Sequence, residues 1–194
     1  MRKVPIIKRE KTRGAGIDGY FLAYPLNEGG FIENINRESS LENQGVSTGK
    51  DRYGSDGKAA VFNGASYLSS PLFDDLQDAT YVLWVKSDKD QTATILSLGN
   101  NCFSGYSIRL DKSVLDILCG GVTGNVTHSA YRLPIGEWVQ IALVKSSNNF
   151  SIYVNGELSS SGSSSHNSLN SPVYRGCRVG LQSGWHRGIL YRKY

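Results

Sequence analysis

Acidic side chains could give this chain catalytic chemistry if two of them stood on one face of a strand. Retaining glycosidases hold two carboxylates about 5 Å apart, and a strand would supply them as alternating acids, but no Glu-x-Asp-x-Glu occurs here. The nearest acidic cluster, FDDLQD at residues 73–78, contains no Glu, and we expect it to be a solvated loop. The sequence therefore predicts that the protein is not an enzyme.

Nucleophilic and zinc chemistry are disfavoured as well. Residues 45–49 (GVSTG) match G-x-S-x-G, but they lack the preceding strand and following helix that expose such a serine. The histidines and cysteines lie in separate segments without zinc-site spacing: His128, His166, His186, Cys102, Cys119 and Cys177. We expect exposed loop histidines and structural thiols, with a Cys102–Cys119 pair left open.

Calcium is the metal that the sequence accommodates best. It accepts carboxylate and carbonyl oxygens from irregular loops, and Asp74, Asp75 and Asp78 are the candidates by that logic. The alternative is that these residues end a strand and stay hydrated. No cofactor is required, and calcium is possible.

A glycan site needs aromatic faces beside a few fixed polar groups. The segment SGWHRG places Trp185, His186 and Arg187 between two expected strands, in the one part of the chain where a Trp lies outside an apparent core strand. Secondary candidates are the neighbours Tyr131 and Arg132, and Arg52 and Tyr53. The alternative for each aromatic side chain is that it folds over the edge of the sheet.

These side chains must be positioned by strands. Short runs of β-branched and aromatic residues recur between Gly, Asn, Asp and Ser, and no window shows a helical period. We expect strands at residues 19–26, 58–62, 80–86, 93–98, 105–110, 114–119, 137–145, 150–154 and 177–181. The pattern predicts an all-β, antiparallel sandwich in one domain.

Turn residues refine this prediction. Residues 146–149 (SSNN) and the pair Asn155 and Gly156 predict tight hairpins, because Asn-Gly supplies the positive φ values of a two-residue turn. Residues 33–56 and 159–171 read as long, mobile, polar loops. The strand at 137–145 is apolar on both faces and should be central and covered on both sides.

Eight motifs occur in an order that resembles the laminin-G-like group of concanavalin A-like jelly-roll domains of bacterial and phage proteins. They are YPLNE (24–28), VFNGASYLS (61–69), YVLWVKSD (81–88), ILSLGN (95–100), GYSIRL (105–110), GEWVQIALVK (136–145), SIYVNGEL (151–158) and VGLQS (179–183). The resemblance implies a two-sheet antiparallel jelly-roll sandwich with loops at one rim. Such domains mostly bind glycans or proteins, and often hold a rim calcium.

The C-terminal end departs from the family pattern. Members usually run through a Gly-x-Ile-Asp-x-Val-Arg-Ile-Tyr strand and continue, whereas residues 188–194 (GILYRKY) lack the Asp and stop early. The last strand is therefore expected to be shortened, or to be completed by the N-terminal segment or a neighbouring chain.

Charge is divided unevenly along the chain. The net charge of +4 combines +5 in residues 1–13, +5 in residues 175–194 and −6 in the body between them. We expect residues 1–16 to be a basic N-terminal arm that anchors the protein, and residues 17–194 to be the jelly-roll domain. The anchoring residues would be Arg2, Lys3, Ile6, Ile7, Lys8 and Arg9, with the isoleucines inserted between neighbouring subunits.

The sequence shows neither a signal peptide nor a membrane span. The leading hypothesis is a phage virion component, of capsid decoration or fibre type, that displays a lectin-like domain to host or environmental glycans. The alternative is a carbohydrate-binding module of a bacterial surface or secreted protein. Nucleic acid is the less favoured partner of the arm, because aromatic residues are not interleaved with its basic ones.

Overall fold

The computed structural model describes Leu26 and residues 41–70, 78–100, 104–119, 125–164 and 177–182. Every regular element in these ranges is a β-strand, and they contain no helix that could cross a membrane. The N-terminal arm and the end of the chain lie outside the described residues. The all-β prediction is confirmed for the part of the chain that is described.

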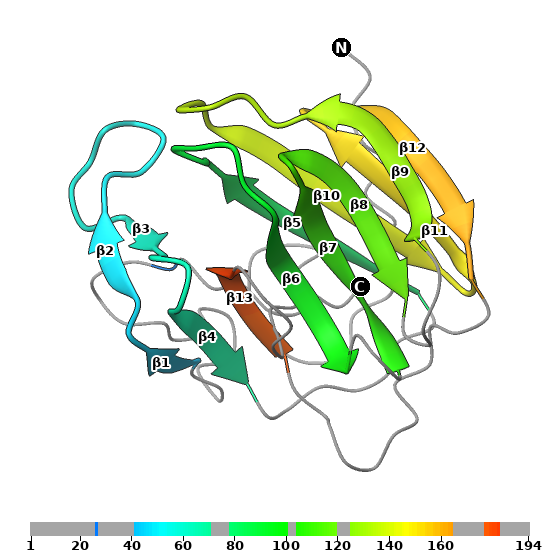
Figure 1. The fold of residues 1–194 in the computed structure, drawn as a ribbon, viewed down its shortest axis with the longest axis horizontal. Helices are drawn as coiled ribbons and strands as arrows, with labels where there is room; N and C mark the ends of the chain where they lie inside the picture. The colour runs from blue at the N-terminus through cyan, green and yellow to red at the C-terminus, as the bar shows by residue number, and fades with distance from the viewer. Residues whose placement is uncertain are drawn as a thin grey trace, which may run out of the picture.

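Two antiparallel sheets form the body of the protein (Figure 1). The larger contains, in spatial order, β1 (Glu42–Gln44), β4 (Tyr67–Ser70), β13 (Cys177–Gln182), β6 (Ala93–Asn100), β7 (Ser104–Asp111), β8 (Val114–Cys119) and β9 (Asn125–Arg132). The smaller contains β12 (Glu157–Ser163), β11 (Asn149–Val154), β10 (Val139–Ser146) and β5 (Asp78–Val85). A separate ribbon pairs β2 (Ser47–Gly49) with β3 (Ala59–Val61).

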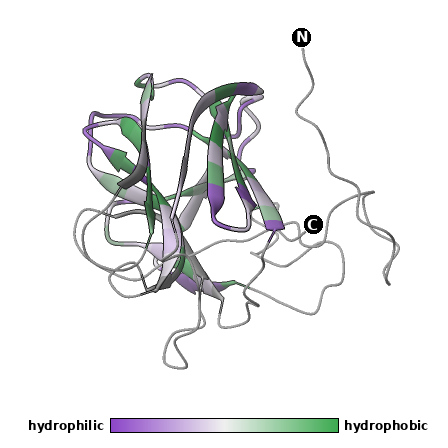
Figure 2. Ribbon diagram, turned by 90° about the vertical axis from the view of Figure 1, so that its right-hand side faces the viewer, coloured by the Kyte–Doolittle hydropathy of each residue, from purple (hydrophilic) through white to green (hydrophobic). Residues whose placement is uncertain are grey.

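The hydrophobic core lies between the two sheets because alternate residues of each strand point inward. On β10 these are Val139, Ile141 and Leu143, and on β8 they are Leu115 and Ile117, all buried. Apolar residues lie along the strands, while hydrophilic colour gathers at turns and strand ends (Figure 2). Burial of these side chains supplies most of the free energy that holds the sheets together.

Both predicted tight turns are present. Asn155 and Gly156 have φ values of 49° and 88° and connect β11 to β12. In the other hairpin Ser146 pairs with Asn149, and Ser147 has a φ of 53°. The prediction that β10 is central is also confirmed, since it lies between β11 and β5. Its outer face is covered only in part, because Ala142 is buried but Gln140 and Val144 are half-exposed.

The two segments predicted as mobile loops contain strands instead. Within 33–56, β1 and β2 form, and Asn43 holds the turn between them, since its amide accepts from the Val46 N–H at 2.7 Å and donates to the Val46 carbonyl at 2.9 Å. Within 159–171, the serine-rich residues up to Ser163 belong to β12, which pairs with β11. Backbone hydrogen bonding to a neighbouring strand overrides the loop-like composition there.

Candidate functional site

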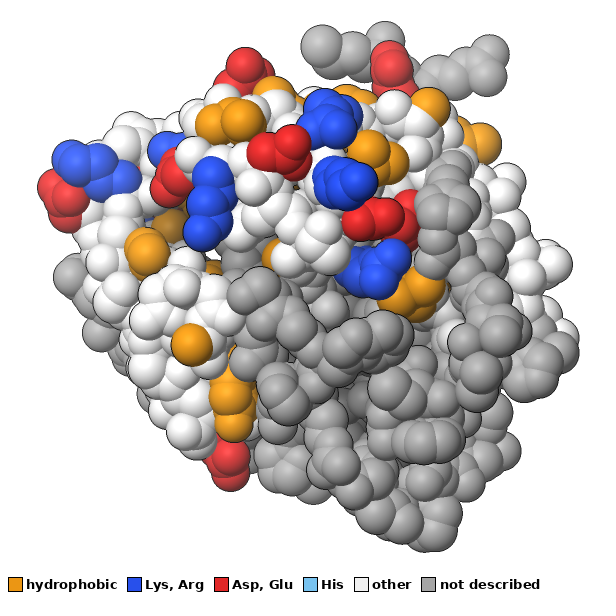
Figure 3. All heavy atoms as spheres, viewed as in Figure 1, with side chains coloured by type: hydrophobic (Ala, Val, Ile, Leu, Met, Phe, Trp, Pro, Cys, Tyr) orange, Lys and Arg blue, Asp and Glu red, His pale blue; other side chains and the backbone are white. Residues whose placement is uncertain are grey.

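One end of the sandwich gathers five connections, at the top of Figure 1. They are residues 50–58 between β2 and β3, 86–92 between β5 and β6, 112–113 between β7 and β8, 133–138 between β9 and β10, and 155–156 between β11 and β12. We call this end the rim. Basic, acidic and hydrophobic side chains are mixed along it (Figure 3). This mixture offers both apolar contact and directed polar groups to a ligand.

Arg52, Tyr53 and Trp84 form a stacked group at the rim, which we call the aromatic cluster. The Cζ of Arg52 lies 4.4 Å from the centroid of the Tyr53 ring and 4.6 Å from that of Trp84. Arg52 Nη2 also donates a hydrogen bond to the Tyr53 hydroxyl at 2.6 Å. Tyr53 remains 75% exposed and Trp84 39% exposed. The cluster therefore presents ring surface and a cation to solvent together.

A compact turn holds the tip that carries Arg52 and Tyr53. The Asp51 carboxylate accepts the backbone N–H groups of Tyr53 and Ser55, each at 2.9 Å. The N–H of Gly54, whose φ is 85°, donates to the Asp51 carbonyl at 3.1 Å. Glycine suits this position because other residues adopt a positive φ at a cost. Tyr53 is thus presented by local hydrogen bonds.

Trp84 is placed by the alternation of β5. Tyr81 is buried in the core and Leu83 and Val85 pack against it, so Trp84 points outward. It stands opposite Gln140 of β10 in the sheet register. Packing of a cation against an aromatic face is attractive, and this contact connects the loop at 50–58 to the sheet.

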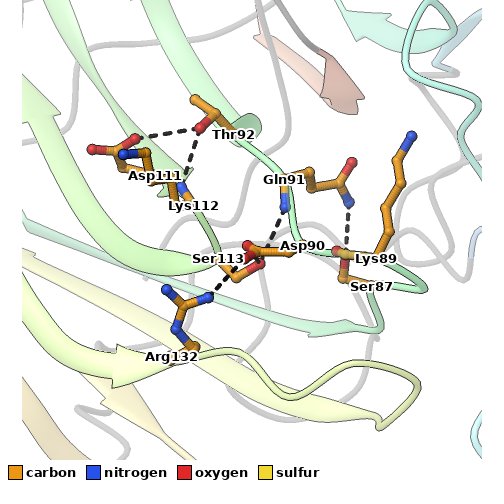
Figure 4. Close-up of polar contacts among 9 residues, drawn as sticks. All are labelled: Ser87, Lys89, Asp90, Gln91, Thr92, Asp111, Lys112, Ser113 and Arg132. Carbon is orange, nitrogen blue, oxygen red and sulfur yellow. Dashed lines mark hydrogen bonds and ion pairs between the residues drawn. The ribbon is translucent and has the colours of Figure 1, made fainter.

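A second group, the rim network, ties three connections together around Asp90 (Figure 4). Ser113 Oγ donates to Asp90 Oδ1 at 2.6 Å, and Arg132 Nη1 donates to Asp90 Oδ2 at 3.0 Å. The Gln91 N–H donates to Ser113 Oγ at 3.2 Å. The Ser113 hydrogen bond, followed by the one from Arg132, lowers the pKa of Asp90 below its ordinary value.

The rim network is structural in character. Ser113 has a φ of 64°, its N–H donates to the Gln91 carbonyl, and its carbonyl accepts from the Leu133 N–H. The Lys89 side chain points away from the network in Figure 4. The acceptors of Asp90 and one donor of Arg132 are used within the protein, so this group holds the loops in place and leaves the aromatic cluster as the better ligand site.

The other predicted site residues fall in several places. Tyr131 is half-buried against the core, where desolvation and then the Glu137 charge raise its pKa; this placement favours the alternative that the ring folds over the sandwich. Asp78 Oδ1 accepts from Ser146 Oγ at 3.0 Å and from the Ser147 N–H at 3.2 Å, and so supports the β10–β11 hairpin. The remaining candidates lie outside the described residues: Asp74, Asp75, Trp185, His186, Arg187, Arg2, Lys3, Ile6, Ile7, Lys8 and Arg9.

No metal centre is evident in the described ranges, where no three His, Cys, Asp or Glu side chains gather. Cys119 is a free, buried thiol. Desolvation raises its pKa to about 12. This agrees with the prediction of a structural thiol for Cys119, because a thiol held neutral is a poor metal ligand and nucleophile.

The outer face of the larger sheet carries a buried ion pair. Asp116 on β8 is fully buried and lies 3.6 Å from Arg109 on β7. Its cross-strand neighbours in the register are Arg109 and His128. Neither cross-strand neighbour of Asp116 is an acid.

Sequence reasoning identified Arg52 and Tyr53 but missed Trp84. Trp84 lies within the strand predicted at residues 80–86, and it was therefore counted among the tryptophans of apparent core strands. The position of Trp84 along the strand could have identified it. Tyr81, Leu83 and Val85 follow one another at every second residue and share one face, so Trp84, between Leu83 and Val85, must lie on the opposite face.

The two packed antiparallel sheets and loop-bearing rim define a concanavalin A-like sandwich. The chain belongs to the concanavalin A-like lectin/glucanases superfamily, whose laminin-G family model matches residues 60–187. The predicted laminin-G-like resemblance is thus confirmed. No curated protein matches the sequence.

Solved structures share the fold. Domain 4 of AbnA, an extracellular arabinanase of family GH43 from Geobacillus stearothermophilus, was solved in complex with arabinotriose; it is 17% identical, with a TM-score of 0.66 over 90% of this chain and 88% of that one. The binding domain of botulinum neurotoxin DC, in complex with SialylT, is 14% identical, with a TM-score of 0.55 over 84% of this chain and 44% of that one. The chain thus spans less than half of the toxin domain, and at these identities the likeness concerns the fold.

Proposed function

We propose that this protein is a non-catalytic carbohydrate-binding module of a surface or secreted protein, and that the aromatic cluster of Arg52, Tyr53 and Trp84 binds the glycan. The observation that carries the proposal is that two exposed rings are held together by one guanidinium at the rim. Aromatic rings cover the apolar C–H faces of sugars, while neighbouring polar groups hydrogen-bond to their hydroxyls.

The fold comparisons support this setting. The arabinanase domain and the toxin binding domain were solved in complex with arabinotriose and with SialylT, respectively. Fold alone does not determine function, so the argument for this chain depends on the cluster itself. A preorganised cluster also favours binding, because little side-chain entropy remains to be lost.

Two acids of the described residues favour a binding role without catalysis. Asp90 is held ionised by two donors, which makes it a poor general acid at neutral pH. Asp116 is fully buried beside Arg109 and is not exposed to a ligand at the surface. We therefore infer that the rim holds its ligand without cleaving it.

Calorimetry on the full chain tests the proposal, with arabinotriose and a sialylated oligosaccharide as probes. Trp84→Ala and Tyr53→Ala should each weaken binding of whichever probe the protein binds by about 10-fold. Covering about 50 Å² of ring surface at about 25 cal/mol per Å² contributes about 1.3 kcal/mol, which is close to a factor of ten. Leu158→Ala is the matched control, since Leu158 is 58% exposed on β12, across the smaller sheet from β5. Unchanged affinity in both aromatic variants would contradict the proposal.

The virion setting stays a prediction. It depends on residues 1–16, which lie outside the described residues, and the fold comparisons favour the carbohydrate-binding alternative. Deletion of residues 2–13 should empty virions of the protein if the arm anchors it. Normal occupancy after the deletion would count against an anchoring arm.

A further inference from the structure

The charge of Arg52 is not neutralised within the described part of the chain. Arg109 and Arg132 are each within ion-pair distance of a carboxylate, as are Lys50 and Lys86. Arg52 instead contacts two rings and one phenol oxygen. Arg52 therefore combines a position held by two ring contacts with a charge that no carboxylate of the described residues neutralises.

The nearest acids in sequence are already engaged. The Asp51 carboxylate accepts two backbone N–H groups of its own turn. Asp56 lies 3.2 Å from Lys50 Nζ. Neither acid is in position to neutralise Arg52, so a ligand could supply the missing anion.

We propose that the aromatic cluster recognises a carboxylate-bearing sugar, such as a uronic or sialic acid, with Arg52 as the residue that binds the carboxylate. This inference rests on the proposed function and names its substrate class. A guanidinium has five N–H donors in a planar fork that matches a carboxylate. One donor of Arg52 is used on Tyr53, and the described residues accept no other hydrogen bond from its guanidinium.

The rings add the second element of recognition. Tyr53 and Trp84 fix the plane of the guanidinium, which lowers the entropy lost when it forms two hydrogen bonds. Their exposed edges and faces lie within a few ångströms of the charge. A carboxylate attached to a sugar ring brings an apolar C–H surface close to an anion, and this combination complements the cluster.

The sharpest test compares trigalacturonate with its methyl ester, because esterification removes the charge and keeps the sugar. Wild-type protein should bind the free acid about 10-fold more tightly than the ester, the range of one charge-assisted hydrogen-bond pair. Arg52→Gln should abolish this preference, so that the acid and the ester bind with equal affinity. Arg52→Lys should retain part of it, since the charge remains but the fork is lost.

A control that removes a different positive charge distinguishes direct binding by Arg52 from the overall electrostatic potential of the rim. Lys112→Gln removes one exposed cation from the β7–β8 turn and should leave the acid-to-ester ratio unchanged. Added salt should weaken binding of the acid and spare the ester. Sialyllactose against lactose repeats the comparison with a second acidic sugar.

The outcomes distinguish the two proposals. Equal binding of acid and ester, or a preference that survives Arg52→Gln, would overturn the carboxylate assignment and leave the proposed function standing. If the protein binds none of arabinotriose, sialyllactose, trigalacturonate or its ester, the proposed function itself fails. A preference for the acid that Arg52→Gln removes and Lys112→Gln keeps establishes the assignment.

Discussion

The hydroxyl groups of Tyr81 on β5 and Tyr106 on β7 lie 2.6 Å apart in the core and share a hydrogen bond between the two sheets. Their ring centroids are 5.9 Å apart in an edge-on arrangement, and Tyr106 also contacts Phe150 at 5.3 Å. Apolar packing has little directional preference. A polar contact inside it fixes how one sheet sits on the other.

Tyr81→Phe and Tyr106→Phe should each lower the free energy of unfolding by about 1–2 kcal/mol, the usual loss for a buried hydroxyl hydrogen bond. The double variant should lose less than the sum, because the first substitution already removes the shared bond. Urea unfolding measures all three, with the outward-facing Tyr153→Phe as a control. Additive losses would mean that the two hydroxyls are not energetically coupled.

Asp116→Ala should destabilise the protein by about 3 kcal/mol, because it leaves Arg109 without its carboxylate in a largely buried position. Asp56→Ala should cost no more than about 1 kcal/mol, since its pair with Lys50 is exposed. Equilibrium unfolding in urea compares the two. Similar losses of unfolding free energy in the two variants would contradict the expectation that the buried ion pair contributes more than the exposed one.

Acid should weaken the rim network through Asp90. Its folded pKa is below the ordinary 3.8, so the stabilisation by the ionised carboxylate is complete above that value and is lost as pH falls through the folded pKa. Asp90→Asn should therefore lower the Tm at about pH 7 and have a smaller effect near pH 2.5. Asp88→Asn is the control in the same loop. An equal Tm difference at both pH values would argue against this role.

The contribution of Asp78 to folding stability should not depend on calcium. Because its carboxylate accepts two hydrogen bonds at the β10–β11 hairpin, Asp78→Ala should lower stability by about 1 kcal/mol. The loss should be the same with calcium or with a chelator, and Glu157→Ala at the next hairpin should change little. A loss seen only with calcium would instead assign Asp78 to a metal site.

The strands with strong alternation could be predicted from the sequence. β8 was predicted with its observed bounds, and β5, β6, β7, β10, β11 and β13 within three residues at either end. Their signal is local, because inward-facing apolar residues recur every second position. β9 and β12 were missed because polar and serine-rich stretches carry no such signal. Their strand conformation comes from pairing with β8 and β11.

The candidate site was predictable only in part. Arg52 and Tyr53 are adjacent in sequence, so their association could be proposed directly. The partners that decide the other roles are distant: Arg132 meets Asp90 across 42 positions, and Trp84 reaches Arg52 from another sheet. Such contacts depend on the completed fold.

The loop at 50–58 is held by its own turn, through Asp51, Gly54 and the Lys50–Asp56 pair, while the core lies elsewhere. The residues at its tip can therefore be replaced without disturbing the packing of the core. Under the proposed function, grafting a loop of equal length from a homologous sandwich should alter which sugar is bound, while the thermal stability of the scaffold is kept. The residues of this loop can thus be changed independently of the residues that hold the fold together.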